Sequence, residues 1–164
     1  MSARRAIEIL LVEDNPGDVR LAREAFHDAA VPHRFHWVHD GVEALAFLRK
    51  EGRHYQAPVP DLVLLDLKMP RKGGQELLTE LRLDQNFKHL PILILTSAFA
   101  EDPVHHIAAQ QATVFLTKPL EIDGYIRMAR SIGDRWQTLS AGSGSGSASS
   151  EVWRGVGSTV FRNE

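Results

Sequence analysis

Acidic and basic residues stand directly after three short apolar runs, where buried strands are expected to end. They are Glu13 and Asp14 after residues 7–12, Asp66 after residues 62–65, and Lys118 after residues 114–117. The carboxyl ends of parallel strands are where open α/β sheets build their sites. Neighbouring carboxylates repel one another unless a cation lies between them, and oxygen ligands of this kind suit Mg²⁺. Because a lysine beside them can neutralise a phosphoryl group, the pattern predicts a Mg²⁺-dependent phosphate acceptor.

Apolar runs and helix-start signals alternate along the chain and must position these residues. Strands are predicted at Ile7–Val12, Phe35–Val38, Leu62–Asp66, Ile92–Thr96 and Val114–Thr117. Helices are predicted to begin at Asn15-Pro16, Asp40-Gly41, Gly73-Gly74, Asp102-Pro103 and Ile122, since a capping side chain, a proline or a glycine stands at most of these points. Five strand–helix alternations predict a doubly wound, five-stranded parallel sheet with helices on both faces.

Composition limits the class of protein. The 164 residues carry a formal charge of −2, no cysteine and no basic run. We therefore expect no disulfides, no nucleic-acid partner and a reducing compartment. The apolar runs are shorter than the roughly 20 residues that span a membrane, and the first residues are too short for a signal-peptide core. The prediction is a cytoplasmic protein with no membrane partner.

The composition changes abruptly near the end of the chain. We predict one domain over residues 1–139, a Gly/Ser linker over 140–150 and a terminal peptide over 151–164. Two interpretations of the terminal peptide stay open at this point. It is either a natural arm that docks on a partner, or a foreign peptide joined through an artificial Gly/Ser linker.

Taken together, these motifs resemble the response-regulator receiver domain of the CheY-like superfamily, over about residues 7–136. The segment Leu-Val-Glu-Asp-Asn-Pro-Gly-Asp at 11–18 is similar to single-domain regulators that partner phytochrome-type histidine kinases. The resemblance implies a (βα)5 flavodoxin-like fold and a phosphoryl group received from a sensor histidine kinase. It also implies signalling by protein contact, without a DNA-binding output domain and without classical enzyme activity beyond self-phosphorylation and self-dephosphorylation.

Residue roles follow from the resemblance. Asp66 matches the phosphoacceptor, Asp14 the direct Mg²⁺ ligand and Glu13 the second acid of the pair. Lys68 occupies the position whose backbone carbonyl ligates the metal.

Other positions match groups that contact the phosphoryl group or respond to it. Thr96 matches the hydroxyl residue, Lys118 the lysine, and Phe115 the aromatic switch position, with phenylalanine where tyrosine is frequent. Supporting positions are Pro70, Gly74, Ala98 and Pro119. Lys68 and Ala98 are expected to flank the path of the hydrolytic water. Gly73 departs from the family pattern, in which many members carry Asp.

Two other functions compete with phosphate acceptance as explanations of these residues. A phosphatase with an aspartate nucleophile is disfavoured, because such enzymes resemble Asp-x-Asp after the first strand. A degenerate receiver-like module that only mediates dimerisation or contacts stays as the alternative, and loss of an acid or of Lys118 would have supported it.

The last helix leads to a prediction about assembly. Its buried face is expected to contain Ile122, Ile126, Ala129, Gly133 and Trp136. A neighbouring strip of Tyr125, Met128 and Ile132 would then stay exposed in a monomer. We therefore predict a homodimer through the fourth helix, fifth strand and last helix. The terminal apolar residues, Val152, Trp153, Val160 and Phe161, are expected to dock on a protein surface.

Overall fold

The computed structural model describes residues 5–67, 72–96, 111–141 and Trp153. Within these ranges a parallel sheet forms the centre of the molecule, with strand order β2-β1-β3-β4-β5. The strands are β1 (Ile7–Val12), β2 (His33–Val38), β3 (Leu62–Asp66), β4 (Ile92–Thr96) and β5 (Val114–Thr117). This arrangement confirms the predicted doubly wound sheet, with β2 beginning two residues earlier than expected.

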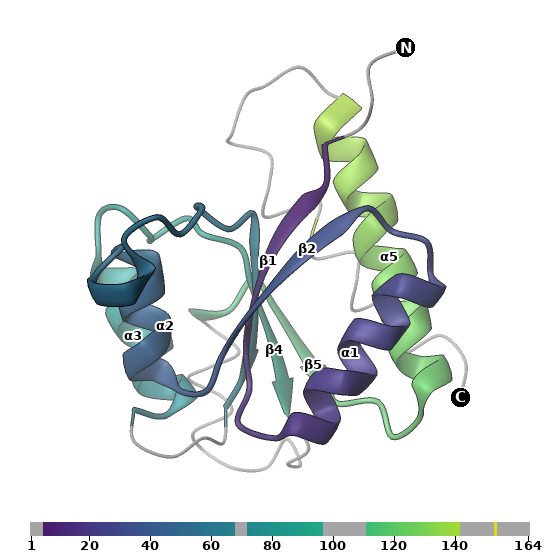
Figure 1. Cartoon of the computed structure of the whole chain (residues 1–164), viewed down its shortest axis with the longest axis horizontal. Coiled ribbons are helices and arrows are strands. Elements are labelled where there is room, and N and C mark those ends of the chain that lie inside the picture. Colours follow the sequence, from purple (N-terminus) through teal and green to yellow (C-terminus); the bar gives the residue numbers. More distant parts are fainter. Residues whose placement is uncertain (1–4, 68–71, 97–110, 142–152, 154–164) are drawn as a thin grey trace.

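Helices cover both faces of the sheet (Figure 1). They are α1 (Pro16–Asp28), α2 (Gly41–Leu48), α3 (Gly74–Leu83) and α5 (Ile122–Ala141), with a short 3-10 turn, η1 (Gly52–His54), in the loop after α2. Helices α1 and α5 lie on one face and α2 and α3 on the other. The helix predicted over 102–110 lies outside the described residues.

The two hydrophobic layers follow from the alternation of side chains along each strand. In β1, Ile9 and Leu11 join the cluster under α1 and α5, whereas Leu10 and Val12 join the cluster under α2 and α3. All five residues of β3 and of β4 are buried, as expected for central strands covered on both sides. The outer strand β2 is only partly buried.

The strand order creates a switch point between β1 and β3. From β1 the chain moves outward to β2, then returns to the other side of β1 as β3. The connections on either side of that point therefore diverge to opposite faces, and open α/β sheets build their sites at the carboxyl ends of such strands. Glu13 and Asp14 directly follow β1, and Asp66 ends β3. The topology therefore brings the acids to the switch point.

Helix caps fix the segments that leave these strand ends. Asn15 Oδ1 accepts hydrogen bonds from the backbone N–H of Gly17 at 2.8 Å and of Asp18 at 3.4 Å, and Pro16 is the first residue of α1. Asp40 Oδ1 accepts from the N–H of Glu43 at 2.9 Å and starts α2. Both caps agree with the sequence prediction.

The buried face of α5 agrees with the one predicted at Ala129 and Gly133 and differs from it at the other positions. Tyr125, Met128 and Ile132, which the sequence assigned to an exposed strip, are at most 1% exposed within a single chain. Ile122, Ile126 and Trp136 lie at the margins and are only partly buried. The reason is that α5 packs against both the sheet and α1, so its buried arc is wide and centres on Tyr125, Met128 and Ile132. The exposed strip on which the homodimer prediction rested is therefore absent from this helix, and the homodimer stays a prediction without that support.

Trp153 is buried in the core of its own chain. Its side chain is 1% exposed and belongs to the apolar cluster under α1 and α5. Trp153 thus docks on the domain of its own chain, where the sequence predicted docking on a protein surface. The other terminal apolar residues, Val152, Val160 and Phe161, lie outside the described residues.

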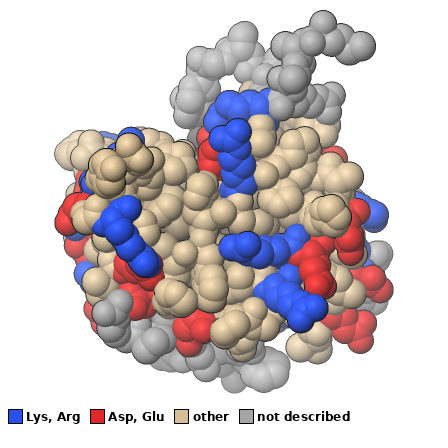
Figure 2. Space-filling model, viewed as in Figure 1, with Lys and Arg blue, Asp and Glu red and all other residues tan. Residues whose placement is uncertain are grey.

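The described surface carries charges of both signs. On the face drawn in Figure 2, Lys and Arg side chains lie among Asp and Glu side chains and form no continuous basic area. Among the described helices, none is long and apolar enough to cross a membrane. The predicted absence of a nucleic-acid partner and the cytoplasmic location stay predictions.

Candidate functional site

Three carboxylates gather at the carboxyl ends of β1 and β3. One oxygen from each of Glu13, Asp14 and Asp66 can be chosen so that all three atoms lie within 4.8 Å of one another. The side chains of Glu13 and Asp66 are 3% and 7% exposed, whereas Asp14 is exposed. This places buried acids behind an accessible one, so the group opens to solvent on the side of Asp14.

Lys118 contacts the same group from the end of β5. Its ammonium nitrogen lies 2.8 Å from Glu13 Oε2 and 3.2 Å from Asp66 Oδ2. It also donates a hydrogen bond to Asp18 Oδ2 at 2.7 Å. A primary ammonium group has three N–H donors. These three carboxylates therefore match its full donor capacity.

The site perturbs the acid–base properties of its members. Burial raises the pKa of Glu13 to about 8. The hydrogen bond from Lys118 lowers this pKa, and the nearby charge of Asp66 raises it. Burial disfavours the charged form of Lys118, but hydrogen bonds to Asp18 and Glu13 and the charge of Asp66 outweigh it and raise the lysine pKa. The charged form of Lys118 is accordingly favoured at this site.

Thr96 and Phe115 lie near the lysine in the ladder of β4 and β5. Thr96 is fully buried at the end of β4, and its carbonyl accepts a hydrogen bond from the N–H of Lys118 at 2.8 Å. Phe115 is only partly buried and packs beside the cluster under α2 and α3. The expected switch residues are thus connected to the lysine through one strand pair.

Two of the supporting positions have a clear packing role. A Cβ atom on Gly74 would lie 2.5 Å from the carbonyl oxygen of Asp66, so α3 begins in direct contact with the end of β3. Pro119 packs equally closely on α5, since a Cβ on Gly124 would lie 2.7 Å from the proline Cβ. Three of the predicted site residues lie outside the described residues, namely Lys68, Pro70 and Ala98.

Sequence reasoning missed Asp18 as a member of the site. It lies in the first turn of α1, 100 positions from Lys118 in the chain, and its side chain is 26% exposed. Its place in the helix gave a weak signal, because an acid in a first turn is ordinarily explained by the helix dipole alone. Only the tertiary structure, which brings the start of α1 to the residue after β5, reveals the ion pair.

The donor set fits a divalent cation. Three carboxylates within reach of one another offer hard oxygen ligands, and Mg²⁺ takes one or two carboxylates while keeping waters. Glu13, Asp14 and Asp66 would hold the ion, which explains why unbalanced carboxylates are clustered beside a single lysine.

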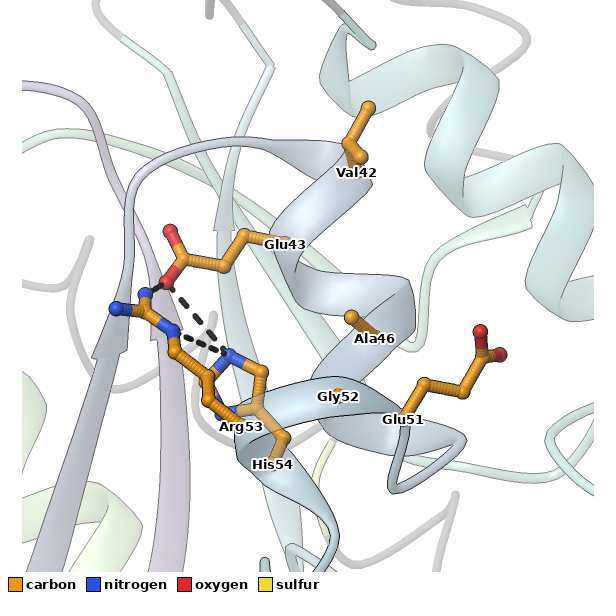
Figure 3. A pocket seen from close by; sticks show the side chains of 7 residues that line it. All are labelled: Val42, Glu43, Ala46, Glu51, Gly52, Arg53 and His54. Atoms are coloured by element: carbon orange, nitrogen blue, oxygen red, sulfur yellow. Dashed lines mark hydrogen bonds and ion pairs between the residues drawn. The ribbon is translucent and has the colours of Figure 1, made fainter.

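A separate hollow of about 520 Å³ lies between α2 and η1 and includes none of these residues. Figure 3 shows its lining, which is Val42, Glu43, Ala46, Glu51, Gly52, Arg53 and His54. The Glu43 carboxylate inside it is paired with Arg53 and lies 3.6 Å from His54 Nε2. Arg53 pairs with the Glu43 carboxylate, and Glu51 adds a second carboxylate to the lining.

Comparison with known proteins places these features in context. A model of the response regulator receiver domain matches residues 9–130. The chain is 34% identical over 128 residues to the response regulator Rcp1 of Synechocystis sp., covering 78% of this chain and 87% of that protein.

Solved structures give the same result. The crystal structure of the phosphorylated cyanobacterial phytochrome response regulator RcpA superposes with a TM-score of 0.73 at 36% identity, covering 82% of this chain and 96% of that one. The crystal structure of the Mn²⁺-bound form of the response regulator Rcp1 superposes with a TM-score of 0.70 at 34% identity. The match covers 79% of this chain and 94% of that one. The fold is thus shared with phytochrome response regulators, and one of these structures is of a Mn²⁺-bound form.

Proposed function

Because the chain belongs to the response-regulator receiver family of two-component signalling, we propose that it accepts a phosphoryl group on Asp66 from a sensor histidine kinase. The observation that carries this proposal is the meeting of Glu13, Asp14 and Asp66 with Lys118 at the switch point of the sheet. The similarity to Rcp1 and RcpA favours a kinase of the phytochrome type.

The proposed step is a transfer between two side chains. A carboxylate oxygen of Asp66 attacks the phosphorus of a phosphohistidine; the new P–O bond replaces the P–N bond, and the released imidazole takes a proton from water. Lys118 supplies positive charge to the phosphoryl oxygens, as phosphoryl transfer requires. A bound Mg²⁺ would add further charge neutralisation. Water later cleaves the acyl phosphate, which restores the Asp66 carboxylate and releases inorganic phosphate.

Output through protein contact rather than catalysis is part of the same proposal. Thr96 and Phe115 lie on neighbouring strands beside Lys118 and can report its state to the surface. The rival view of a degenerate contact module is disfavoured, because a degenerate site has no reason to keep a buried lysine among three carboxylates. A homodimer as the output form stays a prediction to be tested by light scattering of the full chain.

The test is intact-mass analysis with Mg²⁺ and a small acyl phosphate donor. We expect one phosphoryl addition to the wild type and none to Asp66→Asn or after chelation. Asp134→Asn, an exposed aspartate on α5, is the matched control and should label normally. Full labelling of Asp66→Asn would exclude this acceptor. Transfer from phytochrome-type and unrelated histidine kinases, compared at equal concentrations, then tests the partner class.

A further inference from the structure

Lys118 divides its contacts unequally among its three carboxylates. The nitrogen–oxygen distance is shortest to Asp18, at 2.7 Å, and longest to Asp66, at 3.2 Å. With three donors, the ammonium group has none left over for a new acceptor. When a phosphoryl group appears on Asp66, its oxygens therefore compete with the carboxylates that Lys118 already contacts.

Burial determines whether the Lys118 contact with Glu13 or the one with Asp18 costs less to break. Glu13 is 3% exposed, so water cannot replace Lys118 as the partner of its carboxyl group. Asp18 is 26% exposed and lies in the first turn of α1, where water and the helix dipole both stabilise a carboxylate. Breaking the contact with Asp18 consequently costs less than breaking the contact with Glu13.

Local structure also fixes where Asp18 holds the lysine. The Asn15 cap binds the N–H of Asp18 and orients the first turn of α1. The Asp18 carboxylate therefore pulls the ammonium group toward the helix, whereas the acceptor lies at the end of β3. Asp18 and Asp66 are competitors for the same charge.

We propose that Asp18 is a positioning residue that holds Lys118 toward α1 in the unphosphorylated protein and competes with Asp66 for it. The inference rests on the proposed function, since it concerns regulation of the same site. Asp18 acts on phosphorylation through the lysine to which it is hydrogen-bonded. Its role is to restrain the unphosphorylated protein from accepting a phosphoryl group too readily.

The kinetic test compares labelling rates with a small acyl phosphate donor at saturating Mg²⁺. Asp18→Asn keeps the side-chain shape and removes the charge, so the rate constant at saturating donor should rise by about three- to tenfold. Asp18→Glu keeps a carboxylate and should stay within about twofold of the wild type. The matched control is Glu24→Gln, which removes one charge from the same helix at a residue paired with Arg20.

A second measurement follows the lysine itself and does not depend on labelling. The ¹⁵Nζ signal of Lys118, assigned by its loss in Lys118→Arg, should move in Asp18→Asn and stay in place in Glu24→Gln. A helix-stabilising role alone would lower the melting temperature of Asp18→Asn without raising its labelling rate.

The outcomes separate this inference from the proposed function. A wild type that takes no phosphoryl group on Asp66 overturns the proposed function, while the lysine signal still reports on the contact. A wild type that is labelled, with an unchanged or lower rate in a folded Asp18→Asn, overturns the positioning role. An unmoved Lys118 signal in Asp18→Asn does the same.

Discussion

At the scale of single residues, the site is governed by one buried cation among several acids. Lys118 keeps its proton because Asp18, Glu13 and Asp66 together outweigh the effect of burial. Such a cation is difficult to replace, since removing it would leave buried carboxylates without a partner. The charges of this site also act on Tyr125 of α5. Asp18 raises the pKa of its hydroxyl, and Lys118 lowers it.

The first prediction concerns that tyrosine. Burial and then the charge of Asp18 raise the pKa of Tyr125 to about 12. An unfolded tyrosine titrates at about 10, so the stabilisation is complete below that pH and is lost as pH rises toward about 12. Urea unfolding at about pH 8 and at about pH 11 should therefore show the wild type losing more free energy of unfolding than Tyr125→Phe does.

The control for this titration is Tyr55→Phe, which changes a tyrosine that is 67% exposed. It tests whether the loss of free energy of unfolding at high pH comes from Tyr125 and not from an exposed tyrosine. If the free energy of unfolding changed with pH equally in the wild type and in Tyr125→Phe, Tyr125 would be exposed to solvent, as the sequence predicted.

At the scale of elements, the junction between β3 and α3 determines how the acceptor is presented. The N–H of Gly74 donates to the carbonyl of Leu67 at 3.1 Å, and no side-chain cap supports this helix start. Two consecutive glycines therefore have different roles. Gly74 allows close contact with Asp66, whereas Gly73 lies in open space with its nearest neighbour for a Cβ at 4.0 Å.

The second prediction uses this pair. Gly74→Ala places a Cβ against backbone atoms of Asp66 and Leu67, so overpacking should lower the free energy of unfolding by about 1–3 kcal/mol. Gly73→Ala is the adjacent control and should be neutral or slightly stabilising. Gly73→Asp, the residue frequent in the family, should add a helix cap of about 1 kcal/mol. Equal stabilities of the two alanine variants in urea would contradict this account.

At the scale of the whole molecule, the core extends beyond the region matched by the family model. That match ends at residue 130, yet Trp153 joins the cluster under α1 and α5. Close packing at the same cluster is found at Gly133, where a Cβ would lie 2.7 Å from Cγ2 of Val31, a residue packed against that cluster. The terminal peptide therefore contributes to the stability of the domain through one large side chain.

The third prediction follows from this burial. Trp153→Ala should lower the free energy of unfolding by about 3–5 kcal/mol, as for other buried aromatic truncations. Leu83→Ala, at a side chain that is 82% exposed, is the control and should have little effect. A chain ending at residue 139 should lose a comparable amount. Unfolding midpoints equal to those of the full chain would show that Trp153 contributes nothing in solution.

The sequence by itself determined the strands, the helix caps and the group of Glu13, Asp14, Asp66 and Lys118. These features depend on local patterns, because a short apolar run, a capping side chain and a strand-end acid are each visible within a few residues. Parallel strands then bring their carboxyl ends together whatever the loops do.

Only the tertiary structure decided which face of α5 is buried, that Asp18 pairs with Lys118, and where Trp153 lies. The helical period fixes which residues share a face, but the width of the buried arc depends on how many elements pack against the helix. An ion pair across 100 positions and the burial of Trp153 leave no periodic trace in the sequence. Both depend on contacts between segments that lie far apart in the chain.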